Sequence, residues 1–258
     1  MIPFADLLAA PVRQSSVLEE TAHRAWPLPD DSWVMAQTWD DLLFAHWPVE
    51  PAGLRGRVPA GLQLEEHGGS AWLGITPFEI TGLRVRGTFP LPRVSRFPEL
   101  NVRTYVTHED RPGIWFFSLD TPSRFAVEAA RRLYRLPYFQ AGMTFERRAG
   151  GVAIESVRDE AKAFSASYRP TGRPEVAGRG SLEHFLTERY CLYAEHGGRL
   201  HRAEIHHRPW PLQSAEATID LNSMPPDGMA LEGDPLLHFS KRQDVVIWPL
   251  RDVAARIG

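Results

Sequence analysis

The sequence predicts an α+β protein that is mostly β, with an antiparallel sheet curled into a barrel or sandwich and a few peripheral helices. Three observations predict this class. Many short runs alternate between polar and apolar residues, as strands do when one face is buried. Turn-forming residues separate these runs, and only two or three segments have helical spacing. Strands and helices do not alternate regularly, which argues against a parallel sheet.

Composition predicts one domain. The chain has 258 residues, 43% of them hydrophobic, which is enough for one large core. We expect residues 1–258 to form a single domain, with residues 1–31 as an N-terminal arm and residues 32–250 as the barrel. The net charge is −3 and the basic residues are scattered, so a nucleic-acid partner is not expected.

The N-terminal ten residues are apolar, but no basic region precedes them and Asp6 interrupts them, so they do not resemble a secretory signal. No apolar run approaches the ~20 residues that a membrane span requires. The expectation is a cytoplasmic protein without a membrane partner. Whether it forms a homo-oligomer is left open.

The first half of the chain predicts four strands and one ambiguous run. The run 39–47 is apolar enough to be a buried strand or a short helix before Pro48. The loop 108–113 is rich in turn formers and joins two strands into a hairpin. The other strands of this half are predicted at 33–38, 71–80, 101–107 and 114–119.

Two helices are predicted in the second half. Thr121 and Pro122 can start a helix over residues 125–136, in which Phe125, Ala129 and Leu133 share one face. Ser181 can cap a short helix that runs to Leu186. The remaining runs are short, turn-bounded strands at 144–148, 152–158, 161–168, 190–195, 200–206, 236–240 and 244–248.

The run 97–106 carries the strongest functional signal. Strand alternation places four polar side chains on one face: Glu99, Asn101, Arg103 and Tyr105. The opposite face is largely apolar and must be buried. The polar face then points either to water or into a closed sheet that holds a ligand, and the pattern alone leaves both open. Trp115 and Phe117 alternate on the expected partner strand.

Other chemistry has weaker signals. Glu204 and His206 lie two apart on a predicted strand and are zinc-compatible ligands, but the spacing matches no closed metal site and no third ligand is near. Cys191 is the only cysteine and is expected to be buried and inert. A Gly-x-Ser-x-Gly elbow and a phosphate-binding glycine loop are both absent from the sequence. No cofactor is therefore expected.

Several blocks, taken in order, resemble the uncharacterised YqjF-like family of bacterial proteins over about residues 32–250. These blocks are residues 39–48, 97–106, 113–120, 136–138 and 185–190. The family is similar in fold to acetoacetate decarboxylase, which the resemblance implies to be a cone-shaped antiparallel barrel around a small-molecule cavity. The resemblance therefore favours an inward orientation for Arg103.

The resemblance does not extend to the decarboxylase mechanism. That enzyme uses paired lysines after a Phe-Pro step, one of which forms a Schiff base with a keto acid. Here Phe97-Pro98 is followed by Glu99, and the only lysines of the chain are Lys162 and Lys241. An imine-forming decarboxylase is therefore not expected.

The leading hypothesis is a protein that binds a small organic acid or carbonyl compound inside the barrel. In it Arg103 anchors the anion, with Asn101 also contacting the ligand, and Glu99 and Tyr105 are the acid/base groups. The aromatic walls are expected from Trp39, Trp115 and Tyr138. If the protein is an enzyme, a lyase or isomerase step fits best. The alternatives are a non-catalytic sensor or protein-interaction module, and a metal-assisted hydrolase at Glu204 and His206.

Overall fold

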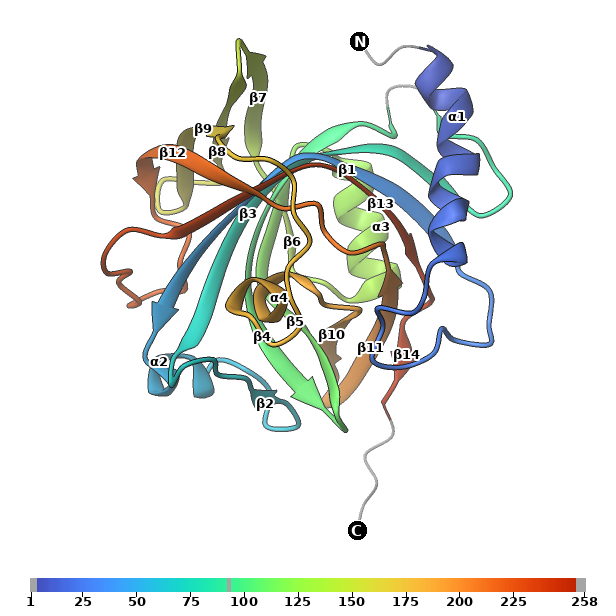
Figure 1. Cartoon of the computed structure of the whole chain (residues 1–258). Helices are drawn as coiled ribbons and strands as arrows, with labels where there is room; N and C mark the ends of the chain where they lie inside the picture. Colours follow the sequence, from blue (N-terminus) through green and yellow to red (C-terminus); the bar gives the residue numbers. More distant parts are fainter. Residues whose placement is uncertain (1–3, 92–93, 254–258) are drawn as a thin grey trace.

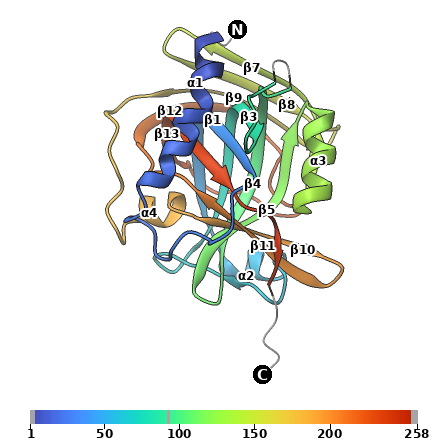
Figure 2. The same cartoon turned by 90° about the vertical axis from the view of Figure 1, so that its right-hand side faces the viewer.

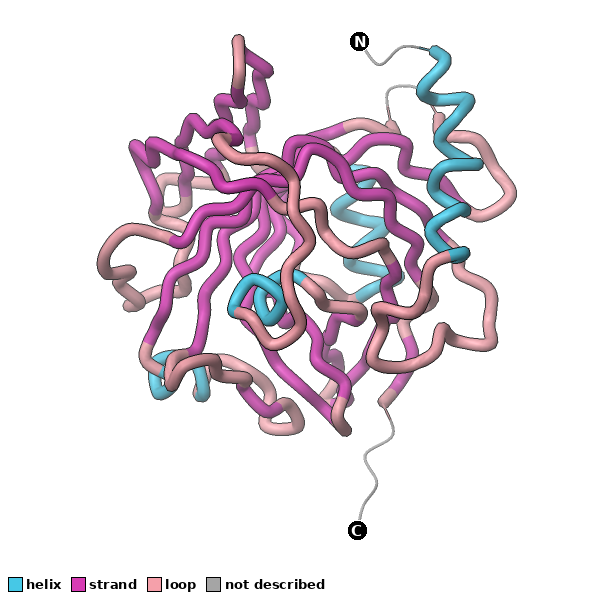
Figure 3. The backbone as a smooth tube through the Cα atoms, viewed as in Figure 1, coloured by secondary structure: helices cyan, strands magenta, loops and turns pink. Residues whose placement is uncertain are grey.

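One continuous sheet organises the part of the chain that the computed structural model describes, residues 4–91 and 94–253 (Figure 1). Its 14 strands are β1 (Met35–Val49), β2 (Gln63–Leu64), β3 (Ala71–Val85), β4 (Phe97–His108), β5 (Arg111–Thr121), β6 (Tyr138–Gln140), β7 (Gly142–Arg148), β8 (Gly151–Val157), β9 (Ala163–Pro170), β10 (Cys191–His196), β11 (Arg199–His206), β12 (Gln213–Asn222), β13 (Leu236–Ile247) and β14 (Arg251–Asp252). The helices lie at the periphery (Figure 3): α1 (Phe4–Ser15), the 3₁₀ helix η1 (Ser16–Glu19), α2 (Pro51–Arg55), α3 (Arg124–Tyr134) and α4 (Leu182–Thr187). The α+β, mostly β class is confirmed.

Seven of the strands pair in a ring. The order β11-β10-β5-β4-β3-β1-β13 runs through the centre of the sheet, and β11 also pairs with β13 at Ile205 and Ile247. Strands β12, β9, β8 and β7 continue from β13 and turn away from the ring (Figure 2). Most pairs are antiparallel as expected, but β10 and β6 each pair with β5 in parallel.

The ambiguous run 39–47 is a strand, because β1 pairs with both β3 and β13 along its length. Its pairing with β3 is irregular between Asp40 and Ala45, and Asp41 has a φ of 52° in the same stretch. The hairpin of β4 and β5 is confirmed. Its turn residues Glu109 and Asp110 have φ values of 49° and 56°, which a tight turn between twisted strands requires.

The prediction of two strands at 236–240 and 244–248 is wrong, since β13 is one strand from Leu236 to Ile247. The residues between them form no turn because β13 pairs with β1 through this stretch, at Ser240, Arg242 and Gln243. Arg242 lies opposite Asp40 in the register and the two form an ion pair of 2.8 Å. Strand β12 was not predicted, and its alternating half-buried and exposed pattern is the signal that could have found it.

Helix α3 is confirmed, but its N-cap is Ser123, whose hydroxyl accepts a hydrogen bond from the Ala126 N–H. Thr121, the expected cap, is the last residue of β5. The helix buries Val127 and Tyr134 and leaves the predicted apolar stripe at its surface. None of the helices in the described ranges is long and apolar enough to cross a lipid bilayer.

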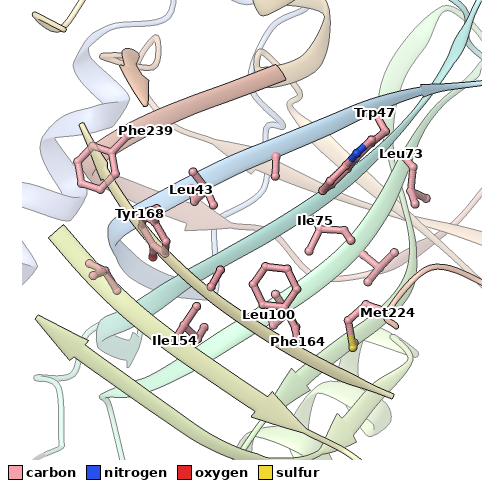
Figure 4. Close-up of a cluster of buried hydrophobic side chains, with 14 of the residues drawn as sticks. Leu43, Trp47, Leu73, Ile75, Leu100, Ile154, Phe164, Tyr168, Met224 and Phe239 are labelled. Carbon is pink, nitrogen blue, oxygen red and sulfur yellow. The ribbon is translucent and has the colours of Figure 1, made fainter. Parts of the chain in front are cut away.

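The apolar face of β4 is buried between two layers of strands, as predicted. Leu100 and Val102 pack in a cluster that joins β1, β3 and β4 to the turned-away strands β8 and β9 (Figure 4). Tyr168 from β9 donates a hydrogen bond from its hydroxyl to the Asp41 carbonyl and so ties the two layers at one edge. Burial of this face turns the polar face of β4 to the other side, which is the inside of the ring.

Phe164 is the side chain whose removal should most weaken this interlayer cluster. It is 1% exposed and lies among Leu100, Ile154 and Met224 (Figure 4). We expect Phe164→Ala to lower the free energy of unfolding by about 3–5 kcal/mol, because it leaves a cavity in a packed interior. Urea denaturation measures this, with Val157→Ala at a 54% exposed position of β8 as the control. Equal effects of the two substitutions would contradict the layered core.

Candidate ligand-binding site

A cavity of about 450 Å³ lies inside the ring of strands. Each of the seven ring strands contributes lining residues, and α3, β6 and the loops that follow β3 and α3 contribute the rest. Most of the lining is apolar. Its polar side chains among the described residues are Gln37, Arg84, Thr88, Glu99, Asn101 and Arg103, together with the hydroxyl-bearing Tyr134 and Tyr138.

Three residues of the predicted polar face meet at this cavity. Glu99, Asn101 and Arg103 all line it and are only 3%, 4% and 5% exposed. They lie on one face because alternate side chains of β4 point to the same side, and the buried cluster of Leu100 and Val102 occupies the other side. The inward orientation that the sequence left open is therefore the one observed.

Glu99 is held by two donors. The Tyr138 hydroxyl donates a hydrogen bond of 2.7 Å to its Oε2, and the Asn101 side chain is a second hydrogen-bond partner. The side-chain Oδ1 of Asn101 in turn accepts a hydrogen bond from the Thr76 hydroxyl. Burial raises the pKa of Glu99 from 4.5 to about 7, against the opposing effect of these hydrogen bonds. Near neutral pH this carboxyl group can therefore accept or donate a proton.

Arg103 has no carboxylate partner among the residues that the structure describes, and its Nε has no hydrogen-bond partner there. Its guanidinium lies 5.2 Å from the centroid of the Phe44 ring and 5.8 Å from that of Tyr105. Glu99, four residues away on the strand, is about 13 Å distant along the backbone at ~3.3 Å per residue. A buried cation without an anion is costly, and a bound anion would remove this cost.

Behind Arg103 lies a chain of hydrogen bonds. Arg103 donates to the Tyr105 hydroxyl, which lies 2.5 Å from the Nε2 of the fully buried His46. Because arginine has only donors, the tyrosine proton goes to His46 Nε2. Burial and the charge of Arg103 lower the pKa of His46 well below 6.5, so this histidine is neutral.

Gly74 makes this arrangement sterically feasible. It pairs with His46 on one side and with Arg103 on the other, in the middle of three adjacent strands. A Cβ at this position would lie 3.0 Å from the His46 ring and 3.3 Å from the Arg103 side chain. Any larger residue would push these two side chains apart.

Tyr105 and Trp115 are not among the described residues that line the cavity, so their expected positions need correction. Tyr105 is completely buried beside Phe185, beyond Arg103. Trp115 packs near Cys191, because the register of β5 places Ile114 and Phe116 on the cavity side instead.

The pairing register of β5 with β4 explains why Phe116, and not Trp115, faces the cavity. Arg103 lies opposite Phe116, and an irregularity in the pairing at Val102 and Arg103 leaves Phe117 as an extra residue on β5. A shift of one residue moves every side chain of a strand to the other face. Trp39 and Tyr138, by contrast, do line the cavity as expected.

Neither lysine is at the cavity. Lys162 forms an ion pair of 2.7 Å with Asp227, and Lys241 lies 2.5 Å from a carboxylate oxygen of Asp41. Neither side chain is among the lining residues. The cavity therefore offers no amine for a Schiff base within the described residues.

The predicted metal ligands have other partners. Glu204 accepts hydrogen bonds from Arg24, Trp26 and Arg111, and His206 Nε2 lies 2.9 Å from the Val17 carbonyl oxygen. Across residues 4–91 and 94–253, no three His, Cys, Asp or Glu side chains gather as a metal site would require.

Cys191 is buried as expected, and burial raises the pKa of its thiol to about 12. At that pKa the thiol is not ionised near neutral pH, which agrees with an inert residue.

Sequence reasoning missed several residues at the site, among them His46 and Gly74, which lie beside the Arg103 and Tyr105 side chains. The signal for His46 was its place on the apolar run 39–47, which becomes a central strand. Gly74 interrupts an apolar strand, and such a glycine marks a point of close approach.

The fold defines the class to which the protein belongs. It is similar to acetoacetate decarboxylase from Legionella pneumophila, with a TM-score of 0.64 and 10% identity over 91% of this chain and 94% of that one. It is also similar to an acetoacetate decarboxylase-like enzyme from Sphingomonas wittichii RW1, with a TM-score of 0.61, 16% identity and coverages of 90% and 98%. The enduracididine biosynthesis enzyme MppR, in complex with pyruvate, gives a TM-score of 0.61 at 12% identity and coverages of 90% and 93%. These likenesses establish an acetoacetate decarboxylase-like fold.

Sequence comparison gives the family. Residues 36–244 match the DUF2071 family, described as an uncharacterized conserved protein, and the chain belongs to this family. It is 48% identical to the uncharacterized protein YqjF of Bacillus subtilis (strain 168) over 228 residues, which are 87% of this chain and 94% of YqjF. The predicted resemblance to the YqjF-like family is confirmed.

Proposed function

We propose that this protein binds a small organic acid or carbonyl compound in the cavity, with Arg103 as the anchor for its anionic group. The observation that carries the proposal is the buried guanidinium without a carboxylate partner in the described structure. Its planar array of donors matches a carboxylate. The pyruvate bound to the structurally similar MppR supports a small organic ligand for this fold. The ring of seven strands would then be the predicted cone-shaped barrel.

Glu99 is the proposed acid/base group. It lies on the same strand face as Arg103 with Asn101 between them, and its pKa of about 7 suits proton transfer near neutral pH. Proton removal next to a carbonyl, as in an isomerase or lyase, needs only such a positioned carboxylate. Tyr105 does not line the cavity, so we assign it the role of positioning Arg103 in place of acid/base work.

A ligand screen tests this function. We expect 2-keto and 2-hydroxy acids to raise the melting temperature of the protein, and the matched primary amides to have no effect, because only the acids supply a charge for Arg103. Thermal shift measures both series side by side. Equal shifts with acids and amides, or none with any acid, would contradict the proposal. Turnover of a binding acid, followed by NMR, separates an enzyme from a non-catalytic sensor.

A further inference from the structure

The cavity wall is divided by chemistry. The buried polar cluster of Glu99, Asn101 and Arg103 comes from β4, whereas the other polar side chains of the lining are scattered over other elements: Gln37, Arg84, Thr88, Tyr134 and Tyr138. The facing walls are mostly apolar, with Trp39 and Phe78 from β1 and β3 and further aliphatic and aromatic side chains from β5 and α3. An acid of three or four carbons can hydrogen-bond to the polar residues of β4 but is too short to contact the apolar walls.

The volume of the cavity also favours a ligand of more than four carbons. At the roughly 30 Å³ that a water molecule occupies in the liquid, the six heavy atoms of butanoate fill at most about 180 Å³. The cavity holds about 450 Å³, which is in the range of sites for larger organic ligands. Decanoate, with twelve heavy atoms, would fill about 360 Å³ by the same measure.

The apolar lining continues to the protein surface. Phe125 and Leu133 on α3 line the cavity and are nevertheless 65% and 67% exposed. Val85 and Phe89, at the end of β3 and in the loop after it, line it as well and are 62% and 63% exposed. We call these four residues the apolar rim. Large side chains of this kind seldom gather at a surface unless they contact something apolar.

Helix α3 presents a wide apolar face to the cavity. Val127 packs into the core without lining the cavity, whereas Tyr134 both packs in the core and lines the cavity. The stripe of Phe125, Ala129 and Leu133 extends the lining towards the surface, where Phe125 and Leu133 are exposed. Packing on the sheet alone does not require apolar residues at these exposed positions.

We propose that the ligand is an amphipathic acid, with its carboxylate or carbonyl head at the polar residues of β4 and an apolar tail that runs along the walls to the apolar rim. This inference rests on the proposed function and deepens it by naming the ligand class. The proposed ligand is larger than pyruvate, and burial of its apolar tail supplies a large share of the binding free energy.

A chain-length series tests the tail. Isothermal titration calorimetry with butanoate, octanoate and decanoate, each below its self-association concentration, should show affinity rising about two- to fourfold for every added methylene. Decanoate should then bind roughly fiftyfold or more tightly than butanoate. Leu133→Ser should weaken decanoate binding about five- to tenfold and leave butanoate binding unchanged. The exposed position predicts that the variant folds normally. Val157→Ser, on β8 away from the cavity lining, is the matched control.

The outcomes separate the two proposals. If butanoate and decanoate bind equally and Leu133→Ser changes neither, the amphipathic ligand is excluded while the proposed organic-acid site stands. If no acid of any length binds, both proposals fail. If Leu133→Ser changes the oligomeric state in analytical ultracentrifugation but not decanoate binding, the apolar rim is covered by a second copy of the chain, and the tail proposal is overturned.

Discussion

Arg103→Met is expected to weaken acid binding strongly and, at the same time, to stabilise the ligand-free protein. Arg103 is 5% exposed and has no carboxylate partner within the described structure, so the folded state carries the cost of a buried cation. Methionine of similar length removes that cost, and we expect the free energy of unfolding to rise by about 1–3 kcal/mol. Loss of a charged hydrogen bond should weaken acid binding about tenfold to a hundredfold. Thermal melts with and without acid measure both effects.

Arg84→Met is the matched control, because Arg84 also lines the cavity. Its guanidinium already donates to the side chains of Gln14 and Ser15 and to the Pro11 carbonyl. Removal should therefore destabilise the protein, since it leaves buried acceptors unpaired, and should leave acid binding in place. If Arg84→Met abolished binding and Arg103→Met did not, the anchor would be Arg84 and the assignment of Arg103 would be wrong.

Glu99→Gln is expected to change the pH dependence of stability. The pKa of Glu99 is about 7 in the folded protein and 4.5 ordinarily, so the folded state binds this proton more tightly than the unfolded state. The resulting contribution is fully present below pH 4.5 and is lost as the pH rises to about 7. The loss is on the order of 3 kcal/mol. Glutamine does not ionise, so the variant should match the natural protein at pH 4.5 and be more stable by about this amount at pH 8.

Urea denaturation across this pH range measures the effect, and Glu155→Gln at an exposed position of β8 is the control. The groups that act on Glu99 besides burial are Tyr138, Asn101 and Asp120. An equal pH dependence of stability in the natural protein and the Glu99→Gln variant would show that folding does not raise the pKa of Glu99. If a turnover is found, the same variant should lower its rate by a factor of about 10²–10⁴, since it removes the proton acceptor.

The local sequence pattern was sufficient to predict those features that depend on a few neighbouring residues. The polar face of β4 was predicted residue by residue, because alternation is a property of the strand itself. The hairpin of β4 and β5 and the short helix capped by Ser181 were predicted for the same reason, since turn formers and caps act within a few residues. The fold class and the family resemblance also came from the sequence.

Pairing between strands was not predictable in the same way. Trp115 was expected at the cavity, but the register of β5 against β4 puts Phe116 there. The two strands predicted within residues 236–248 are one, because β13 pairs with β1 along nearly its whole length. The meeting of His46 with Arg103 over Gly74 depends on three strands lying side by side, which no single run of residues encodes.

The sequence by itself determined which side chains of the central strand share a face and excluded an imine-forming lysine at the Phe97-Pro98 step. Only the tertiary structure decided that this face points into a cavity, that Arg103 lies there without an anion in the described structure, and that Tyr105 supports it from behind. The physical reason is how far apart in the chain the residues lie that determine each property. Alternation is set by the backbone of one strand, whereas enclosure and charge pairing depend on strands far apart in the chain.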